Sequence, residues 1–193
     1  MKNKKTFFII ALVFVLLIGG ATVLYRQLGK NIAAEQLTTQ STNQSDESAA
    51  GETEQKIKAP DFTVYDADGN EVHLADYIGK PIVLNFWASW CGPCQSEMPD
   101  FLEKYLELGD DVHFLMINMT DGARETVESA SAFIAKNGYA FPVFYDTKSD
   151  AASIYGAYSL PTTFFIDADG YAIAQATGAI DAETLQRGLD MIK

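Results

Sequence analysis

The sequence predicts an α/β domain built on a mixed β-sheet, and three observations support this fold class. Short apolar runs typical of buried strands alternate with segments of helical spacing along residues 57–193. Two strands joined by a tight turn stand at the start of this region, and two further strands precede its last helix. Strands that alternate with helices and end in a hairpin indicate a mixed sheet flanked by helices.

The first half of this region contains the predicted hairpin and the first buried strand. The stretch "APDFTVYDADGNEVHLADYIG" is typical of two strands, and Gly69 in its turn can adopt the positive φ that a tight hairpin requires. The run "PIVLNFW" predicts a strand buried on both faces. The spacing that follows predicts a helix whose apolar face carries Met98, Phe101, Leu102, Tyr105 and Leu106.

The second half repeats the alternation of strands and helices. The run "VHFLMINM" predicts another buried strand, and "ARETVESASAFIAKNG" predicts a helix that ends at Gly138. The run "FPVFYD" predicts a strand, which is followed by a short helix near residues 151–155. The stretches "TTFFIDADG" and "YAIAQATG" predict the closing hairpin, and the last helix is expected over residues 181–192.

Residues 1–30 are expected to form an N-terminal membrane anchor. Phe7 to Tyr25 is an uncharged, mostly apolar run of 19 residues, which as a helix would span about 28 Å of a bilayer core of about 30 Å. Lysines before the run favour a cytoplasmic N-terminus, so the catalytic domain is expected outside the cytoplasm. A cleaved signal peptide, with small residues near Ala33, is the alternative, but the run is longer than a signal-peptide core.

Residues 31–56 are expected to form a flexible polar linker to a folded domain at residues 57–193. They are rich in Gln, Thr, Ser, Asn and Glu and show no apolar periodicity. Residues 59–193 carry 7 basic and 21 acidic side chains. Because such an acidic body repels nucleic acid, no nucleic-acid partner is expected.

The chain has two cysteines, Cys91 and Cys94, with Gly-Pro between them. They stand where the first buried strand gives way to a helix, and the free backbone N–H groups and dipole of a helix start favour a thiolate there. Cys94 lies one helical turn beyond Cys91, so its sulfur can attack a mixed disulfide formed at Cys91. The pattern therefore favours a redox-active pair in which Cys91 is the more exposed, attacking thiol.

Other uses of the pair are less favoured. A structural disulfide that closes so small a loop would stabilise the fold little. A zinc site would need two more ligands, and His73 and His113 do not have the required spacing to the cysteines. Haem attachment would need histidine where Gln95 stands. We therefore expect neither a metal nor a cofactor.

Two motifs resemble a known family. The stretch "FWASWCGPCQSEMP" is similar to the active-site turn of the thioredoxin superfamily, and "SLPTTFFIDADG" resembles the segment that carries its cis-proline. With the apolar N-terminal run, the opening "APDFTVYDADGNEVHLADYIGKP" and Glu97, they resemble the TlpA/ResA-like membrane-anchored thiol-disulfide oxidoreductases over residues 57–193. The resemblance implies a thioredoxin-like fold with an N-terminal hairpin and a central insertion between Met116 and Tyr155.

The resemblance also implies roles for particular residues. Cys91 would be the nucleophile and Cys94 the resolving thiol of a redox-active disulfide. Pro161 would be a cis-proline, and Leu160 before it would offer its backbone to an extended substrate segment. Trp90 would flank the active site, and the alternative is an ordinary core tryptophan.

Glu97 is the third candidate catalytic residue. It follows Cys94 by three positions on the predicted helix, so both side chains are expected on nearly the same face. A half-buried carboxylate there would have a raised pKa and could exchange a proton with the resolving thiol. Asn85 stands where many thioredoxins place a buried aspartate, which makes Glu97 the available proton acceptor. The alternative is an exposed, solvated Glu97.

We expect a monomeric extracytoplasmic enzyme that reduces disulfides in exported proteins with electrons from a membrane thiol carrier. In the resembled family, substrates include apocytochromes c during cytochrome c maturation, spore-envelope proteins and methionine sulfoxide reductases. A disulfide-forming oxidase is the first alternative, although Gly-Pro between the cysteines favours a reductase. A peroxiredoxin-like thiol peroxidase is the second, but Leu84 and Ala88 stand where such enzymes need proline and threonine or serine.

Overall fold

The structure is a computed structural model that describes residues 37–40 and 56–193. The membrane anchor predicted at residues 1–30 and most of the predicted linker lie outside the described residues. Among the described residues, none of the helices combines the length and the apolar character that a membrane span requires.

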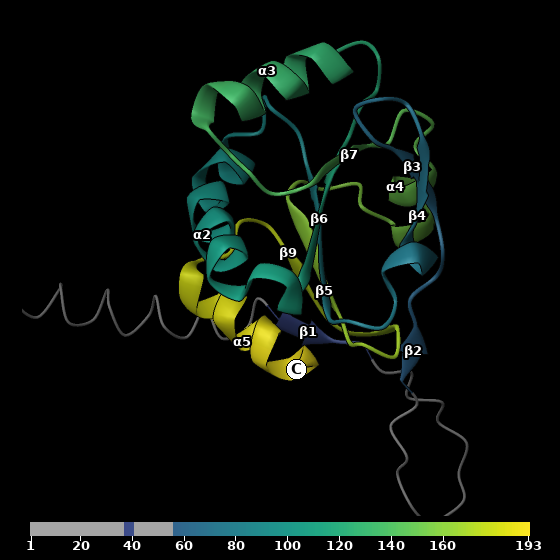
Figure 1. The fold of residues 1–193 in the computed structure, drawn as a ribbon, viewed down its shortest axis with the longest axis vertical. Helices are drawn as coiled ribbons and strands as arrows, with labels where there is room; N and C mark the ends of the chain where they lie inside the picture. The colour runs from purple at the N-terminus through teal and green to yellow at the C-terminus, as the bar shows by residue number, and fades with distance from the viewer. Residues whose placement is uncertain (1–36, 41–55) are drawn as a thin grey trace, which may run out of the picture. The chain divides into compact units, whose positions relative to one another are not determined.

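A mixed β-sheet forms the centre of the domain, as the sequence predicts (Figure 1). Its described strands follow the order β1-β9-β8-β5-β6-β7-β3-β4, and β2 also pairs with β9. The central neighbours β5, β6 and β7 are parallel, whereas the pairs toward both edges are antiparallel. The strands are β1 (Leu37–Thr39), β2 (Ile57–Lys58), β3 (Thr63–Tyr65), β4 (Glu71–His73), β5 (Ile82–Trp87), β6 (His113–Asn118), β7 (Val143–Tyr145), β8 (Thr162–Ile166) and β9 (Tyr171–Thr177).

Helices cover both faces of this sheet (Figure 1). Residues of α2, α3 and α5 share one hydrophobic cluster, and α4 contributes to a second cluster with the β3–β4 hairpin. Two short 3₁₀ turns, Leu74–Tyr77 and Gly109–Asp111, connect strands and helices. The helices are α2 (Gly92–Leu108), α3 (Val127–Asn137), α4 (Asp150–Tyr155) and α5 (Ala182–Ile192).

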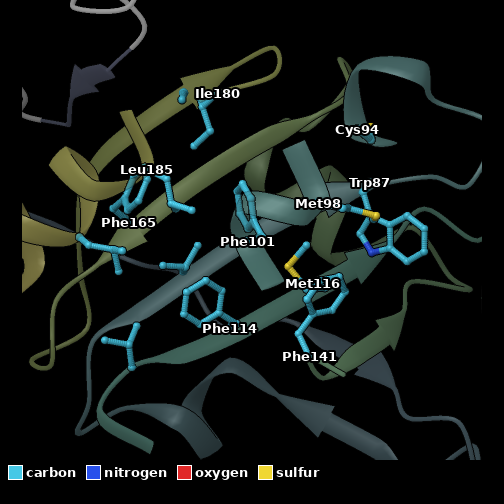
Figure 2. Packing of buried hydrophobic residues seen from close by; sticks show 14 of the residues in the cluster. Trp87, Cys94, Met98, Phe101, Phe114, Met116, Phe141, Phe165, Ile180 and Leu185 are labelled. Carbon is cyan, nitrogen blue, oxygen red and sulfur yellow. The ribbon is translucent and has the colours of Figure 1, made fainter. Parts of the chain in front are cut away.

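Strand β5 separates the two hydrophobic clusters, because all 6 of its residues are buried and successive side chains point to opposite faces. Val83 and Trp87 pack in the first cluster, with aromatic and methionine side chains of α2 and β6 (Figure 2). Leu84 and Phe86 pack in the second cluster, under α4 and the hairpin. Since both clusters hold β5, the end of the strand is fixed from two sides.

The predicted hairpin turn is present between β3 and β4. Gly69 has a φ of 83°, which only glycine adopts without strain. The Asp66 carboxylate accepts hydrogen bonds from the backbone N–H groups of Asp68 and Asn70, both at 2.9 Å. An aspartate at the start of a turn satisfies backbone donors in this way, which explains why this stretch folds back so tightly.

Helix α3 begins later than the sequence predicts. Residues 119–126 form a loop between β6 and α3, here called the β6–α3 loop, because the Asp121 carboxylate accepts hydrogen bonds from the backbone N–H groups of residues 123–125 at 2.8 to 2.9 Å. Thr126 then caps α3 with its side chain. Gly138 follows the helix in the left-handed conformation, so the predicted end is confirmed.

Part of the predicted flexible linker is a strand. Leu37–Thr39 form β1, which pairs antiparallel with residues 174–176 of β9. Leu37 packs against the first cluster, and Gln40 Nε2 donates a hydrogen bond of 2.8 Å to Gln175 Oε1. The backbone groups along the edge of β9 offer a template for an adjacent segment. The expectation of a uniformly flexible linker is therefore wrong for these residues.

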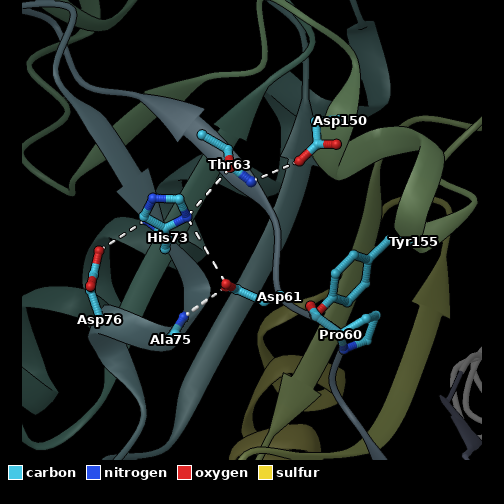
Figure 3. A network of polar contacts seen from close by, with 8 residues as sticks. All are labelled: Pro60, Asp61, Thr63, His73, Ala75, Asp76, Asp150 and Tyr155. Atoms are coloured by element: carbon cyan, nitrogen blue, oxygen red, sulfur yellow. Dashed lines mark hydrogen bonds and ion pairs between the residues drawn. The ribbon is translucent and has the colours of Figure 1, made fainter.

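A polar network holds the start of the domain against α4 (Figure 3). The Asp150 carboxylate accepts a hydrogen bond from the Thr63 N–H at 2.8 Å. The Tyr155 hydroxyl donates to the Pro60 carbonyl at 2.9 Å. His73 lies in a strand, as predicted, and its Nδ1 is 3.4 Å from Thr63 Oγ1. These hydrogen bonds hold the start of the domain against α4, and β3 itself joins the sheet by pairing with β7.

Replacing Gly188 of α5 by alanine is expected to destabilise the domain. A Cβ at this position would lie 2.2 Å from two ring atoms of the fully buried Phe165. The free energy of unfolding, measured by urea denaturation, should fall by about 1–3 kcal/mol, as in other overpacked cores. The loss should shrink in a Phe165→Leu background, where the smaller side chain leaves room. An equal loss in both backgrounds would contradict a clash between these two residues.

Candidate active site

The two cysteines lie in the turn between β5 and α2. Cys91 is the N-cap of α2, and its sulfur accepts a hydrogen bond from the Cys94 N–H at 3.2 Å. The two residues form a disulfide with an S–S distance of 2.11 Å. Cys91 is 4% exposed and Cys94 is 0% exposed. The order of exposure predicted for the pair is confirmed, and Cys91 is the side of the disulfide that a substrate can reach.

Cys91 contributes to the wall of a pocket of about 550 Å³, a volume within the usual range of ligand-binding pockets. Trp90 and Tyr158 also line it and are 41% and 85% exposed. Trp90 is therefore not a core tryptophan, and the buried one is Trp87. The guanidinium carbon of Arg124 lies 3.5 Å from the centre of the Trp90 ring, so a cation is stacked on the wall of the pocket.

The Leu160–Pro161 peptide bond is cis, as the resemblance implies. Leu160 lines the same pocket as Cys91. The Pro161 carbonyl accepts a hydrogen bond of 2.8 Å from the Gly178 N–H, which ties the segment before β8 to the end of β9. The structure thus brings Trp90, Cys91 and Leu160 together around one pocket.

Glu97 is buried on the inner face of α2, with 2% of its surface exposed. Its Oε1 accepts a hydrogen bond from Asn85 Nδ2 at 2.9 Å, and its Oε2 accepts one from the Ile180 N–H at 3.0 Å. The prediction that Glu97 turns inward with Cys94 is confirmed, and the exposed alternative is wrong. Glu97 therefore joins α2 to β5 and to the segment before α5.

Burial raises the pKa of Glu97 to about 7, because the ionised carboxylate loses its hydration. The hydrogen bonds from Ile180 and Asn85 oppose this effect, and the charge of Asp100 adds to it. Asn85 Oδ1 has no hydrogen-bond partner among the described residues. Turning the Asn85 amide by 180° would direct Oδ1 toward Glu97, where it can accept a hydrogen bond from a protonated carboxyl group. The site can therefore accommodate both protonation states of Glu97.

A second buried carboxylate supports the cysteine turn, and sequence analysis missed it. Glu125, in the β6–α3 loop, is 0% exposed. Its Oε1 accepts hydrogen bonds from the Ser89 N–H and Asn118 Nδ2, both at 2.9 Å, and its Oε2 accepts one from the Ser89 hydroxyl at 2.7 Å. Ser89 precedes Cys91 by two residues, so Glu125 ties the cysteine turn to the β6–α3 loop. No local sequence signal distinguishes it from a solvated glutamate.

A pair of thiols that opens and closes one disulfide needs a reachable sulfur, a protected sulfur and a proton acceptor. Here Cys91 and Cys94 supply the two sulfurs, and Glu97 supplies a carboxylate that titrates near neutral pH. Within the described part of the chain, no group of three or more His, Cys, Asp or Glu side chains could hold a metal ion. On a mixed sheet of this order, such a turn defines a thioredoxin-like thiol-disulfide oxidoreductase.

Comparisons with known proteins agree with this class. Residues 56–174 match the AhpC/TSA family. The chain is 37% identical over 136 residues to the thiol-disulfide oxidoreductase ResA of Geobacillus thermodenitrificans (strain NG80-2), and the alignment covers 70% of this chain and 76% of that protein. The chain therefore belongs to the AhpC/TSA family and is a ResA-like thiol-disulfide oxidoreductase of the thioredoxin superfamily.

Solved structures show the same fold. The exposed lipoprotein thioredoxin of Streptococcus pneumoniae strain TIGR4 matches with a TM-score of 0.58 and 33% identity, over 68% of this chain and 98% of that one. A thiol:disulfide interchange protein of the thioredoxin family from Chlorobium tepidum TLS matches with a TM-score of 0.62 and 25% identity, over 75% of this chain and 99% of that one. The predicted thioredoxin-like fold is thus confirmed.

The raised pKa of Glu97 predicts a pH-dependent loss of stability in the oxidised protein. Because the folded state binds this proton more tightly than the unfolded state, the contribution is fully present below pH 4.5 and is lost as pH rises to about 7. The loss should reach about 3 kcal/mol. In the Glu97→Gln variant, the free energy of unfolding measured between pH 4.5 and 8 should lack this component.

The matched control is Glu103→Gln, which removes an exposed carboxylate from the same helix. Its pH dependence should follow that of the unmodified protein. Parallel curves for the unmodified protein and Glu97→Gln would contradict a raised pKa at Glu97.

Proposed function

We propose that this enzyme works outside the cytoplasm and reduces disulfides in exported proteins. The observation that carries the proposal is the arrangement at the head of α2, where only Cys91 of the pair reaches the pocket and the buried Glu97 lies one turn beyond Cys94. The Gly-Pro dipeptide between the cysteines favours the reducing direction. The disulfide in the structure is the state in which the enzyme would end each reduction.

The reduction proceeds in two exchanges. The Cys91 thiolate attacks one sulfur of the client disulfide, and the second client sulfur leaves as a thiolate that takes up a proton. Cys94 then loses its proton and attacks the Cys91 sulfur, which releases the first client sulfur. The client gains two electrons and two protons, and the enzyme is left with the Cys91–Cys94 disulfide. A membrane thiol carrier would return two electrons and two protons to the pair.

Glu97 would serve the second exchange as proton acceptor for Cys94. It follows Cys94 by three residues on α2, so both side chains point to the interior. With a pKa of about 7 it is ionised in a large fraction of molecules near neutral pH, and it still holds a proton at slightly lower pH. When the disulfide is reduced again, the protonated carboxyl group can return a proton to the Cys94 thiolate.

The proposed location rests on the N-terminal sequence. The uncharged run from Phe7 to Tyr25 follows three lysines, which favours a cytoplasmic N-terminus and a catalytic domain on the other side of the membrane. One structurally similar protein is described as an exposed lipoprotein thioredoxin. The clients would be exported proteins with accessible disulfides, of which apocytochromes c are one class.

The two cysteine roles predict an asymmetry in trapped complexes. In the Cys94→Ser variant the first exchange still occurs but the second cannot, so a mixed disulfide with a protein substrate should accumulate. In the Cys91→Ser variant the remaining thiol is buried, so trapping should fall at least about tenfold. The complexes are counted on non-reducing gels. Equal trapping by both variants would contradict the assignment of Cys91 as nucleophile.

The reduction potential of the Cys91–Cys94 pair tests the proposed direction. The full-length chain would be equilibrated near pH 7 with glutathione and dithiothreitol buffers, and the free thiols would be counted. A value near the thioredoxin end of the scale, about −270 mV, is expected for a reductase. A value near −120 mV, as in strong oxidants, would overturn the proposal and favour a disulfide-forming oxidase.

The peroxidase alternative gains no support from the site. Leu84 and Ala88, which occupy the positions where a peroxiredoxin needs proline and threonine or serine, are 0% exposed and hydrophobic. Neither side chain can donate a hydrogen bond to a peroxide.

A further inference from the structure

The pocket beside Cys91 has an uneven charge distribution. Trp90, Met119, Tyr158 and Leu160 give it apolar and aromatic walls. Among the described residues that line it, Arg124 is the basic one and Asp121 the acidic one. Residues 59–193 carry 21 acidic and 7 basic side chains, so most of the charged groups of the domain are negative. The positive guanidinium in the pocket beside Cys91 differs from this overall charge.

The guanidinium of Arg124 stacks on Trp90 and makes no ion pair with the described residues. Its central carbon lies 3.5 Å from the Trp90 ring centre, and a guanidinium stacked on an aromatic ring can still donate hydrogen bonds from its N–H groups. None of the ion pairs formed by the described residues includes Arg124. Asp121 is near enough to interact with its charge, but Asp121 Oδ1 already accepts three backbone hydrogen bonds from the β6–α3 loop.

The β6–α3 loop is held firmly at this point. Glu125, the next residue, accepts three hydrogen bonds from Ser89 and Asn118 and is fully buried. This clamp joins the segment that carries Arg124 to the turn that carries Trp90 and Cys91. A charged group held in place before binding loses less conformational entropy when a ligand arrives.

We propose, building on the proposed reductase function, that Arg124 binds a side-chain carboxylate of the client, close in sequence to the cysteine that Cys91 attacks. A planar guanidinium that can donate from its N–H groups matches a carboxylate in a two-point hydrogen bond. The client segment would place its cysteine at Cys91 and its acidic residue against Arg124, while an apolar neighbour contacts Leu160 or Tyr158. The enzyme would therefore select among disulfides by the residues that flank them.

Model peptides test this selection directly. Each peptide carries one cysteine, activated as a mixed disulfide with thionitrobenzoate, and has blocked ends so that no terminal carboxylate is present. A single Glu, Gln or Lys is placed at each position from two before to two after the cysteine. The Cys91 thiolate of the reduced full-length chain attacks the peptide sulfur and releases the coloured thiolate, and Cys94 then frees the peptide. The measured quantity is the second-order rate constant.

The unmodified enzyme should favour Glu over Gln by about fivefold at one or more of these positions, and less at high salt. In Arg124→Gln the ratio should fall to about one, and in Arg124→Glu the Lys peptide should become the preferred one. Lys136→Gln, which removes an exposed charge from α3, is the matched control and should keep the preference.

Three results would overturn either the role of Arg124 or the proposed reductase function on which it rests. Equal rates for Glu and Gln peptides at every position would reject carboxylate recognition while leaving the reductase function intact. A Glu preference that survives in Arg124→Gln would assign the selection to another residue and so reject Arg124. Release from all peptides no faster than in Cys91→Ser would instead count against the reductase function itself.

Discussion

The double-sided burial of β5 is the constraint on which the rest of the structure depends. Its side chains enter two hydrophobic clusters in alternation, so the strand can neither slide nor turn without exposing one of them. The cysteine turn follows the end of β5 at Trp87, and α2 begins at Gly92. A turn held between a fixed strand and a long helix keeps Cys91 at the pocket while Cys94 and Glu97 stay inside. The position of the chemistry thus follows from hydrophobic packing.

Two buried carboxylates serve this turn in different ways. Glu125 accepts three hydrogen bonds, all from groups that hold the loop and the turn together. Glu97 accepts two, and loss of hydration dominates its behaviour, so its proton is exchangeable near neutral pH. The two carboxylates therefore hold different parts of the site: Glu125 joins the β6–α3 loop to the cysteine turn, and Glu97 joins α2 to β5 and to the segment before α5.

Much of the fold and the centre of the site could be predicted because their signals are local. Buried strands such as β5 are marked by apolar runs, and the helical spacing of Cys94 and Glu97 was enough to place both on the inner face of α2. Glu125 escaped prediction because its burial depends on Ser89, 36 residues earlier in the chain. The late start of α3 was not predicted because the Asp121 side chain accepts hydrogen bonds from backbone N–H groups that lie within the predicted helix. Strand β1 was not predicted because it forms by pairing with β9, which is far away in the sequence.

The pairing of β1 and β2 with β9 also covers one border of the sheet. Both short strands lie along the outer side of β9, at residues 174–176 and 171–172. An uncovered strand of 7 residues at this border would present its backbone groups to any extended chain nearby. Because β1 and β2 pair with β9, the backbone groups along these parts of its edge are already hydrogen-bonded and cannot pair with another strand.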